Sequence, residues 1–171
     1  KLYYDKYALI AKMTNYTIDF SAYSIEEGGV EGVFEQHNLS TIFQGDYKFE
    51  DVSLVDTGGL TAWNAGIEVV SIDDSNWTIV RLTHTGGNLF SLDDFEYSTE
   101  MGHTYKLVNP DGVEYQVSTA NNMWDGGEDV NTTTLDNSFS NVAYVDFYSR
   151  AIPINAMGMD FDYTKWKLDD I

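Results

Sequence analysis

The segment from Asn121 to Asp129 gathers oxygen-bearing side chains of the kind that bind metal ions. It carries Asn122, Asp125, Glu128 and Asp129 around a pair of adjacent glycines. Ca²⁺ takes about six to eight oxygen ligands, so this loop could supply several of them. The chain has no cysteine, its three histidines lack zinc-site spacing, and the EF-hand pattern is absent. We therefore predict Ca²⁺ as the cofactor, with a solvated acidic turn as the alternative.

Tryptophans in glycine-rich surroundings indicate a surface for ligands. Trp63 is followed by Asn64 between the glycines at 58–59 and 66, and Trp124 precedes Asp125 in the acidic loop. An exposed ring beside amide and carboxylate groups suits the face of a sugar or the side chain of a peptide. The alternative is that each ring folds back over the core.

Strand-like alternation near the C-terminal end supplies further candidate ligand-binding residues. Apolar residues alternate there with Tyr144, Asp146, Tyr148 and Arg150. Because successive side chains of a strand point to opposite faces, these four should form one outward row. The apolar members of the segment should face the core: Ala143, Val145 and Phe147. A solvated or covered sheet face is the alternative to a binding strip of Tyr144, Tyr148 and Arg150.

Signatures of catalysis are missing from the sequence. The G-x-S-x-G elbow, the Gly-rich phosphate loops and the E-x-D-x-x-E strand pattern of some sandwich glycosidases do not occur. Carboxylate pairs, which glycoside hydrolysis needs, arise by chance in a chain with 28 acidic residues. We expect a protein that is not an enzyme, with a small glycoside hydrolase or polysaccharide lyase as an alternative.

The charge balance excludes whole classes of partner. With 28 acidic and 9 basic residues the formal net charge is −19, which disfavours nucleic acid and anionic membrane surfaces. No apolar run is long enough for membrane insertion. At 171 residues and 43% hydrophobic content the chain can bury one core without disulfides. The acidic excess fits a cationic partner such as Ca²⁺, or simple solubility.

The elements that would position these groups are short strands. Runs rich in β-branched and aromatic residues are separated by glycine, asparagine and aspartate turns, which predicts an all-β antiparallel sandwich of the jelly-roll type. A hairpin is expected over Thr104–Thr119, around a turn at Asn109–Gly112. Residues 1–14 are expected to form a linker or a short helix, and residues 15–171 a single sandwich domain. The other expected strands are Thr17–Phe20, Tyr47–Val55, Ile67–Ile72, Trp77–His84, Asn88–Leu92, Phe95–Ser98, Val142–Ser149 and Met159–Leu168.

Two segments carry a resemblance to a known group of modules. Gly87–Tyr97 resembles a strand pair of extracellular bacterial jelly-roll modules, and Gly158–Thr164 resembles their closing strand, commonly G-x-x-F-D-N-[IV]. Such modules occur in calcium-dependent giant adhesins, and related sandwiches serve as carbohydrate-binding modules. The resemblance implies a structural Ca²⁺ held by Asp162 and by Asp19. Tyr163 departs from the pattern, since asparagine is usual there.

We therefore expect a non-catalytic, Ca²⁺-dependent adhesion module that binds a glycan or a short peptide. It would belong to a secreted or surface bacterial protein and act as a monomeric module within a larger chain, with no nucleic-acid partner and no membrane insertion. A structural spacer module of a large adhesin is the alternative to a ligand-binding role.

Overall fold

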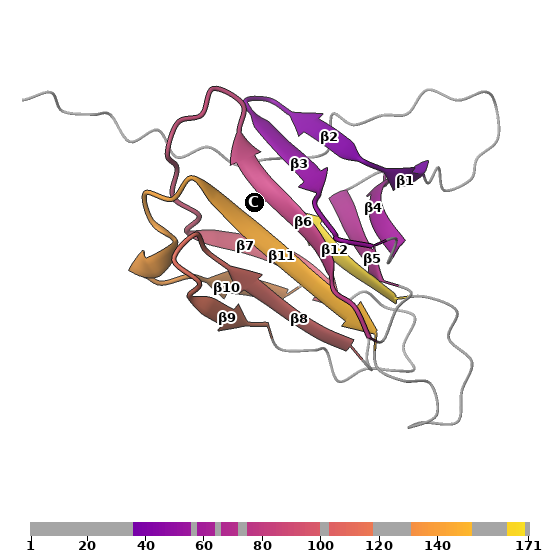
Figure 1. Ribbon diagram of the computed structural model, residues 1–171. Coiled ribbons are helices and arrows are strands. Elements are labelled where there is room, and N and C mark those ends of the chain that lie inside the picture. The colour runs from indigo at the N-terminus through magenta and orange to yellow at the C-terminus, as the bar shows by residue number, and fades with distance from the viewer. Residues whose placement is uncertain are drawn as a thin grey trace, which may run out of the picture.

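Short antiparallel strands make up most of the described chain (Figure 1). The computed structural model describes residues 36–55, 58–63, 66–71, 75–99, 103–117, 131–151 and 164–169. Within them the only helical element is a 3-10 turn, η2 (Asn137–Phe139). No helix in this part of the chain is long and apolar enough to cross a membrane. The predicted all-β class is confirmed.

The strands form two six-stranded sheets, named here by a central strand of each. The β12 sheet has the order β1 (Gln36–Leu39), β4 (Gly58–Trp63), β5 (Gly66–Ser71), β12 (Thr164–Asp169), β7 (Asp94–Thr99) and β10 (Asn131–Thr134). The β11 sheet has the order β2 (Thr41–Gln44), β3 (Tyr47–Asp51), β6 (Thr78–His84), β11 (Tyr144–Ala151), β8 (His103–Val108) and β9 (Glu114–Gln116).

Strand pairing over the last eight strands is nested, like one long hairpin. β8 pairs with β9, β7 with β10, β6 with β11 and β5 with β12, all antiparallel. Successive pairs of this nest alternate between the two sheets. As a result β11 lies between β6 and β8, so its backbone is paired on both sides.

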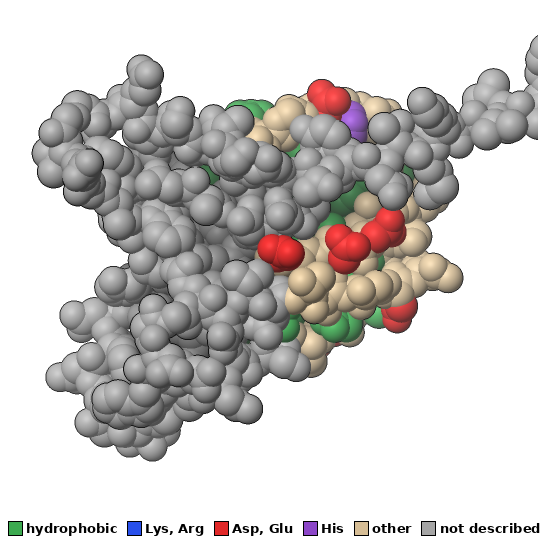
Figure 2. Space-filling model, turned by 180° about the vertical axis from the view of Figure 1, so that it is seen from behind, with side chains coloured by type: hydrophobic (Ala, Val, Ile, Leu, Met, Phe, Trp, Pro, Cys, Tyr) green, Lys and Arg blue, Asp and Glu red, His purple; other side chains and the backbone are tan. Residues whose placement is uncertain are grey.

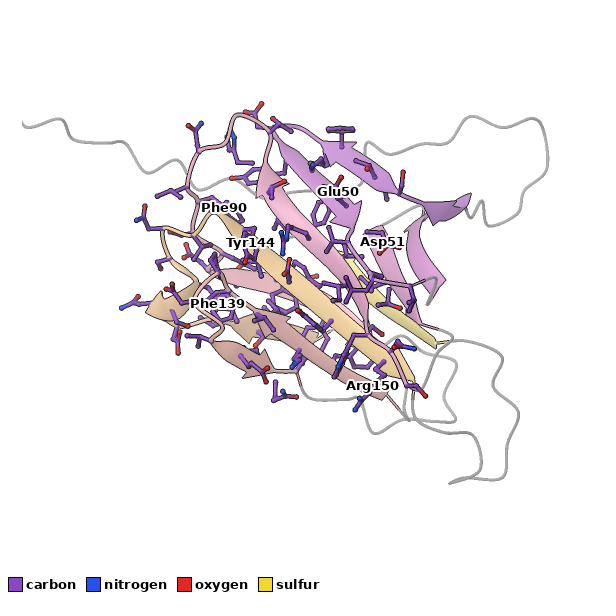
Figure 3. The ribbon with its side chains drawn as sticks, viewed as in Figure 1. Glu50, Asp51, Phe90, Phe139, Tyr144 and Arg150 are labelled. Atoms are coloured by element: carbon purple, nitrogen blue, oxygen red, sulfur yellow. The ribbon has the colours of Figure 1, made fainter. Side chains whose placement is uncertain are left out.

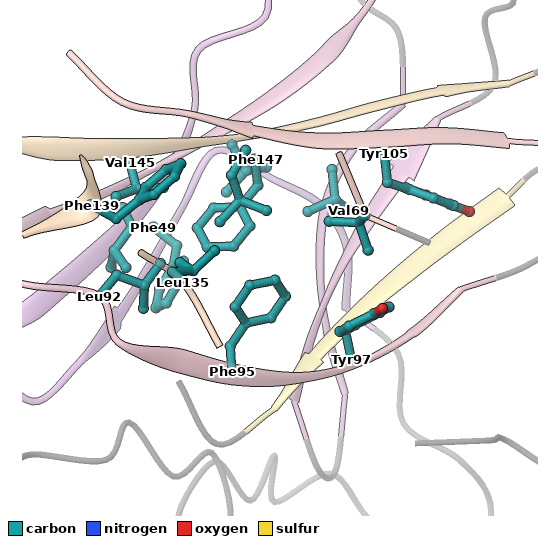
Figure 4. Packing of buried hydrophobic residues seen from close by; sticks show 14 of the residues in the cluster. Phe49, Val69, Leu92, Phe95, Tyr97, Tyr105, Leu135, Phe139, Val145 and Phe147 are labelled. Atoms are coloured by element: carbon teal, nitrogen blue, oxygen red, sulfur yellow. The ribbon is translucent and has the colours of Figure 1, made fainter. Parts of the chain in front are cut away.

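The core lies between the two sheets and follows the alternation of the strands. In β6 the inward residues are Thr78, Val80 and Leu82, while those between them are half-buried on the outer side. Phe95 of β7 meets Phe147 of β11 across the sandwich, with ring centroids 5.9 Å apart and planes nearly perpendicular (Figure 4). Each fully buried apolar side chain stabilises the fold by roughly 1.5–3 kcal/mol. The apolar residues buried without measurable exposure come from both sheets: Phe49, Val69, Val80, Phe95, Leu107, Val145 and Phe147.

The predicted hairpin over Thr104–Thr119 is confirmed as β8 and β9. The Gly112 amide donates to the Asn109 carbonyl at 3.0 Å, and Gly112 takes a φ of 78°, which a side chain would disfavour. The buried Asn109 side chain accepts from the amides of Asp111 and Val113 and donates to the Ser138 carbonyl at 2.6 Å. Asn109 therefore ties the hairpin to η2.

Several expected strands need correction. Asn88–Leu92 is not a strand, because only Phe90 pairs there, in an isolated bridge to Val142. Residues 58–63, which lie outside the expected strands, form β4, and β5 begins at Gly66, one residue before the strand expected from Ile67. Pairing with β1 and β5 on the two sides of β4 outweighs the weak strand propensity of its glycines.

Other expected strands are confirmed only in part or lie outside the described residues. The strand expected over Tyr47–Val55 ends at Asp51. The strand expected over Met159–Leu168 is described only from Thr164 onward. The strand at Thr17–Phe20 and the segment 1–14 lie outside the described residues.

Candidate functional site on the outer face of strand β11

Strand β11 separates a buried row from a half-buried one, as its alternation predicts. Val145 and Phe147 point into the core with no measurable exposure, and Tyr144, Tyr148 and Arg150 are half-buried on the other side. Figure 3 places Tyr144 and Arg150 toward opposite ends of the strand. Ala143, expected in the buried row, is exposed because the chain bends there and β11 begins only at Tyr144.

Antiparallel register fixes which side chains accompany the outward row. Asp146 lies opposite Arg81 of β6 and Val108 of β8, and Tyr148 lies opposite Lys106 of β8. Directly opposed residues of neighbouring strands share a face of the sheet. Trp77 immediately precedes β6 and reaches the same surface. We call this surface the β11 face: Trp77, Arg81, Lys106, Tyr144, Asp146, Tyr148 and Arg150.

One half of the β11 face is an ion pair covered by a ring. Arg81 donates from Nε to Oδ1 of Asp146 at 2.7 Å and from a terminal nitrogen to Oδ2 at 2.8 Å. The guanidinium carbon lies 3.8 Å from the ring centroid of Tyr144. The hydrogen bonds to Asp146 raise the pKa of Arg81 above its ordinary value against the opposing effect of burial. This half offers no unpaired charge to a ligand, because the charges of Arg81 and Asp146 neutralise each other.

The other half of the β11 face joins two cations to two aromatic rings. The guanidinium carbon of Arg150 lies 4.4 Å from the Trp77 ring centroid, and Trp77 meets Tyr148 edge to face at 5.6 Å. The Lys106 ammonium lies 5.1 Å from the Trp77 ring and 5.2 Å from the Tyr148 ring. Cations at such distances are attracted by the negative ring faces, so the four side chains hold one another in place.

Carboxylate partners are distributed unequally among these cations. Lys106 contacts Glu114 at 2.6 Å, and Arg81 is held by Asp146. Within the described ranges Arg150 has no ion pair, although it is half-buried. Burial, followed by the charge of Asp146, raises the pKa of Tyr148. Its hydroxyl therefore stays protonated at neutral pH and can donate a hydrogen bond.

Four of the nine basic residues lie on the outer side of the β11 sheet, while two others, Lys165 and Lys167, belong to β12 of the other sheet. Arg81, Lys106 and Arg150 are on the β11 face, and Lys48 is on the outer side of β3, paired with Glu50 at 2.7 Å. The opposite side of the molecule, seen in Figure 2, shows acidic side chains and no Lys or Arg among its coloured residues. Of the described strands there, β7 carries the exposed Asp94 and the half-buried Glu96. The net charge of −19 therefore conceals a local basic area.

The structure brings together one of the predicted sets. Tyr144, Tyr148 and Arg150 share the β11 face, whereas Trp63 ends β4 in the other sheet, opposite Gly66. The described parts of the chain hold no group of His, Asp or Glu that could bind a metal ion. The remaining predicted ligand-binding and metal residues lie outside the described residues: Asp19, Asn64, Asn122, Trp124, Asp125, Glu128, Asp129 and Asp162.

Sequence reasoning missed three members of the site. Trp77 was expected as the first residue of a strand, and it packs on the outer surface against Tyr148 and Arg150. Arg81 and Lys106 were not singled out. The alternation of β6 and β8 puts both on the polar side, but their juxtaposition with β11 depends on strand pairing, which spacing along one strand does not reveal.

Comparisons with known families, with curated proteins and with solved structures give no match to this chain. The fold and the site together define an all-β protein of two packed sheets with a basic and aromatic outer face. Its function is therefore argued from the geometry of that face.

Proposed function

We propose that this chain is a non-catalytic glycan-binding module whose contact surface is the β11 face. The observation that carries the proposal is the cluster of Trp77, Tyr148, Lys106 and Arg150 on the outside of a central strand. Sugars combine apolar C–H surfaces with many hydroxyls. Aromatic rings interleaved with hydrogen-bond donors complement both, and rings already held in place lose little conformational entropy on binding.

The sequence left a glycan and a short peptide open as ligands, and the β11 face favours the glycan. Extended peptides commonly gain affinity by adding a strand to an exposed sheet edge. The backbone of β11 is paired with β6 on one side and β8 on the other, so it offers no such edge. What this face presents is side chains alone, and these suit a sugar chain lying across the strands.

The wider setting follows from the sequence and is part of the same proposal. The chain would be a jelly-roll module of a secreted or surface bacterial adhesion protein, acting as a monomer within a larger chain. The nested pairing of β5 to β12 across two sheets supports the jelly-roll assignment, which joins eight strands through Greek-key connections. Ca²⁺ would bind the acidic segment at Asn121–Asp129 and, as the resemblance implies, Asp19 and Asp162.

A glycan array with acidic and neutral oligosaccharides tests the proposal. We expect specific binding by the full chain and a loss of it in Trp77→Ala. The matched control is Phe43→Ala, which removes an aromatic ring that is 61% exposed on β2 of the same sheet. Tyr144→Ala provides a second test if the melting temperature of Trp77→Ala falls strongly.

Three outcomes would overturn the proposal. Binding to peptides and to no glycan would make the chain a peptide-binding module. Absence of any ligand, together with a large Ca²⁺-dependent rise in melting temperature, would favour the structural spacer. Cleavage of a polysaccharide that is abolished by one Asp or Glu substitution would make it an enzyme.

A further inference from the structure

We infer that the ligand carries carboxylate groups on its sugars, and that Arg150, held over the Trp77 ring and neighboured by Lys106, binds one of them. The inference rests on the proposed glycan-binding function and specifies its ligand class as a uronic-acid-containing glycan. Its observation is the juxtaposition of two cations on one aromatic support at the β8 side of β11.

The guanidinium of Arg150 is held in an orientation that suits the binding of a carboxylate. Its guanidinium carbon lies 4.4 Å from the centroid of the Trp77 ring, so the ring covers the group from one side. The N–H donors of a guanidinium point outward in its plane, and their fork matches a carboxylate through two parallel hydrogen bonds. Because Trp77 is itself fixed by Tyr148 at 5.6 Å, this fork is pre-organised before the ligand arrives.

Arg150 also differs from its neighbours in its ion pairing. Arg81, Lys48 and Lys106 each contact a carboxylate of the described chain, and Arg150 contacts none there. The chain has about three acidic residues for each basic one, by its counts of 28 and 9. A half-buried guanidinium that has no carboxylate partner among the described residues is available to an external anion. A ligand carboxylate would take the place that Asp146 takes for Arg81.

Lys106 sets how much negative charge the site accepts. Its ammonium lies near both the Trp77 and Tyr148 rings but also contacts Glu114 at 2.6 Å. Two cations and one carboxylate leave a single formal positive charge in the cluster. The chain as a whole, at −19, repels dense polyanions over distances comparable with the Debye length. The site therefore suits a glycan with one carboxylate per sugar, such as a uronate chain, rather than a heavily sulfated one with several charges per sugar.

The test compares oligomers that differ only in their carboxylates. Calorimetric titration of the full chain would use an oligogalacturonate and the same oligomer with its carboxylates methyl-esterified. We expect the acidic oligomer to bind at least about tenfold more tightly, because a charged bidentate contact is lost in the ester. Equal affinities for the two oligomers would overturn the inference.

Variants locate the contact. Arg150→Lys keeps the charge but loses the fork, so we expect about tenfold weaker binding of the acidic oligomer, and Arg150→Gln should be weaker still. The control is Lys48→Gln, which makes the same change in net charge on β3 of the same sheet and should leave the affinity unchanged. Melting temperatures report whether each variant is folded. Wild-type affinity in folded Arg150→Gln would refute the role of Arg150.

The two proposals fail in different ways. Binding of neutral oligosaccharides with no preference for the uronate would overturn this inference and leave the glycan-binding function standing. Absence of binding to every acidic and neutral glycan would overturn both. Binding of an acidic peptide by Arg150, in a chain that binds no glycan, would also overturn both and would reassign the site to peptides.

Discussion

Two ion pairs on the same sheet allow a direct test of how burial sets their strength. Arg81–Asp146 and Lys48–Glu50 both have a shortest N–O distance of 2.7 Å. The Asp146 side chain is 6% exposed, however, and that of Glu50 is 40% exposed. A carboxylate removed from water loses more when its cation is deleted, because water replaces the partner less well.

The magnitude for Asp146→Asn follows from these exposures. Breaking a fully buried pair costs about 3–5 kcal/mol, and an exposed pair contributes about 0–1 kcal/mol. Arg81 is 34% exposed and can still reach water, so we place the cost of Asp146→Asn at about 2 kcal/mol of unfolding free energy. For a domain of this size that lowers the melting temperature by about 4–8 °C.

Urea denaturation of two double-mutant cycles is the assay. One cycle combines Arg81→Met with Asp146→Asn, and the other combines Lys48→Met with Glu50→Gln. We expect a coupling energy of at least about 1 kcal/mol in the first cycle and at most a few tenths in the second. Equal coupling energies in the two cycles would refute the argument that burial, rather than distance, decides the strength of these pairs.

Three further changes have expected outcomes. Asn109→Ala removes three hydrogen bonds of a side chain that is 3% exposed, and should lower the unfolding free energy by about 2–3 kcal/mol in urea melts, whereas a change below 0.5 kcal/mol would contradict this role. The raised pKa of Tyr148 makes its stabilising contribution complete below about pH 10 and lost as pH rises through its folded pKa. Tyr148→Phe should therefore reduce the fall in melting temperature between about pH 8 and 11, and an unchanged fall would argue against it. If Ca²⁺ binds only the folded chain, a hundredfold excess over Kd should stabilise it by about 2.7 kcal/mol, and overlaying melts in Ca²⁺ and EDTA would remove the metal from the proposal.

The pattern of residues along a single strand predicts which side chains face the core and which face outward. Tyr105, Leu107 and the residues of β11 face the sides that their spacing indicates, because a pleated strand turns successive side chains to opposite faces. Asn109–Gly112 likewise forms the expected turn, since proline and glycine have strong local preferences. Asn88–Leu92 shows the limit of this reasoning. Leu92 and Phe90 are buried as in a strand, but only Phe90 finds a backbone partner.

Contacts between strands are what the sequence did not predict. Arg81 and Asp146 are 65 residues apart, and Trp77 reaches Arg150 across the paired strands β6 and β11. Register between such distant segments depends on the whole sheet, and a slip by one residue would move every side chain to the other face. The outward row of β11 was therefore predictable, while the cations and the ring that complete the site were not.

The chain as a whole is negatively charged, whereas the surface around Arg150 and Lys106 is positively charged. This difference gives the carboxylate site an unusual salt dependence. Binding driven by a basic patch on a neutral protein weakens steadily as salt is added. Here the chain carries −19, and at about 0.01 M salt the Debye length of about 30 Å lets this charge repel an acidic oligomer from every side. At about 0.15 M the screening length is about 8 Å, so the distant acids are screened while Arg150 and Lys106 still act at contact distance. We therefore expect oligogalacturonate affinity to rise from low to moderate salt and to fall only above it. A steady decline from the lowest salt upward would show that the net charge does not reach the site, and would contradict the argument that the chain repels heavily sulfated ligands.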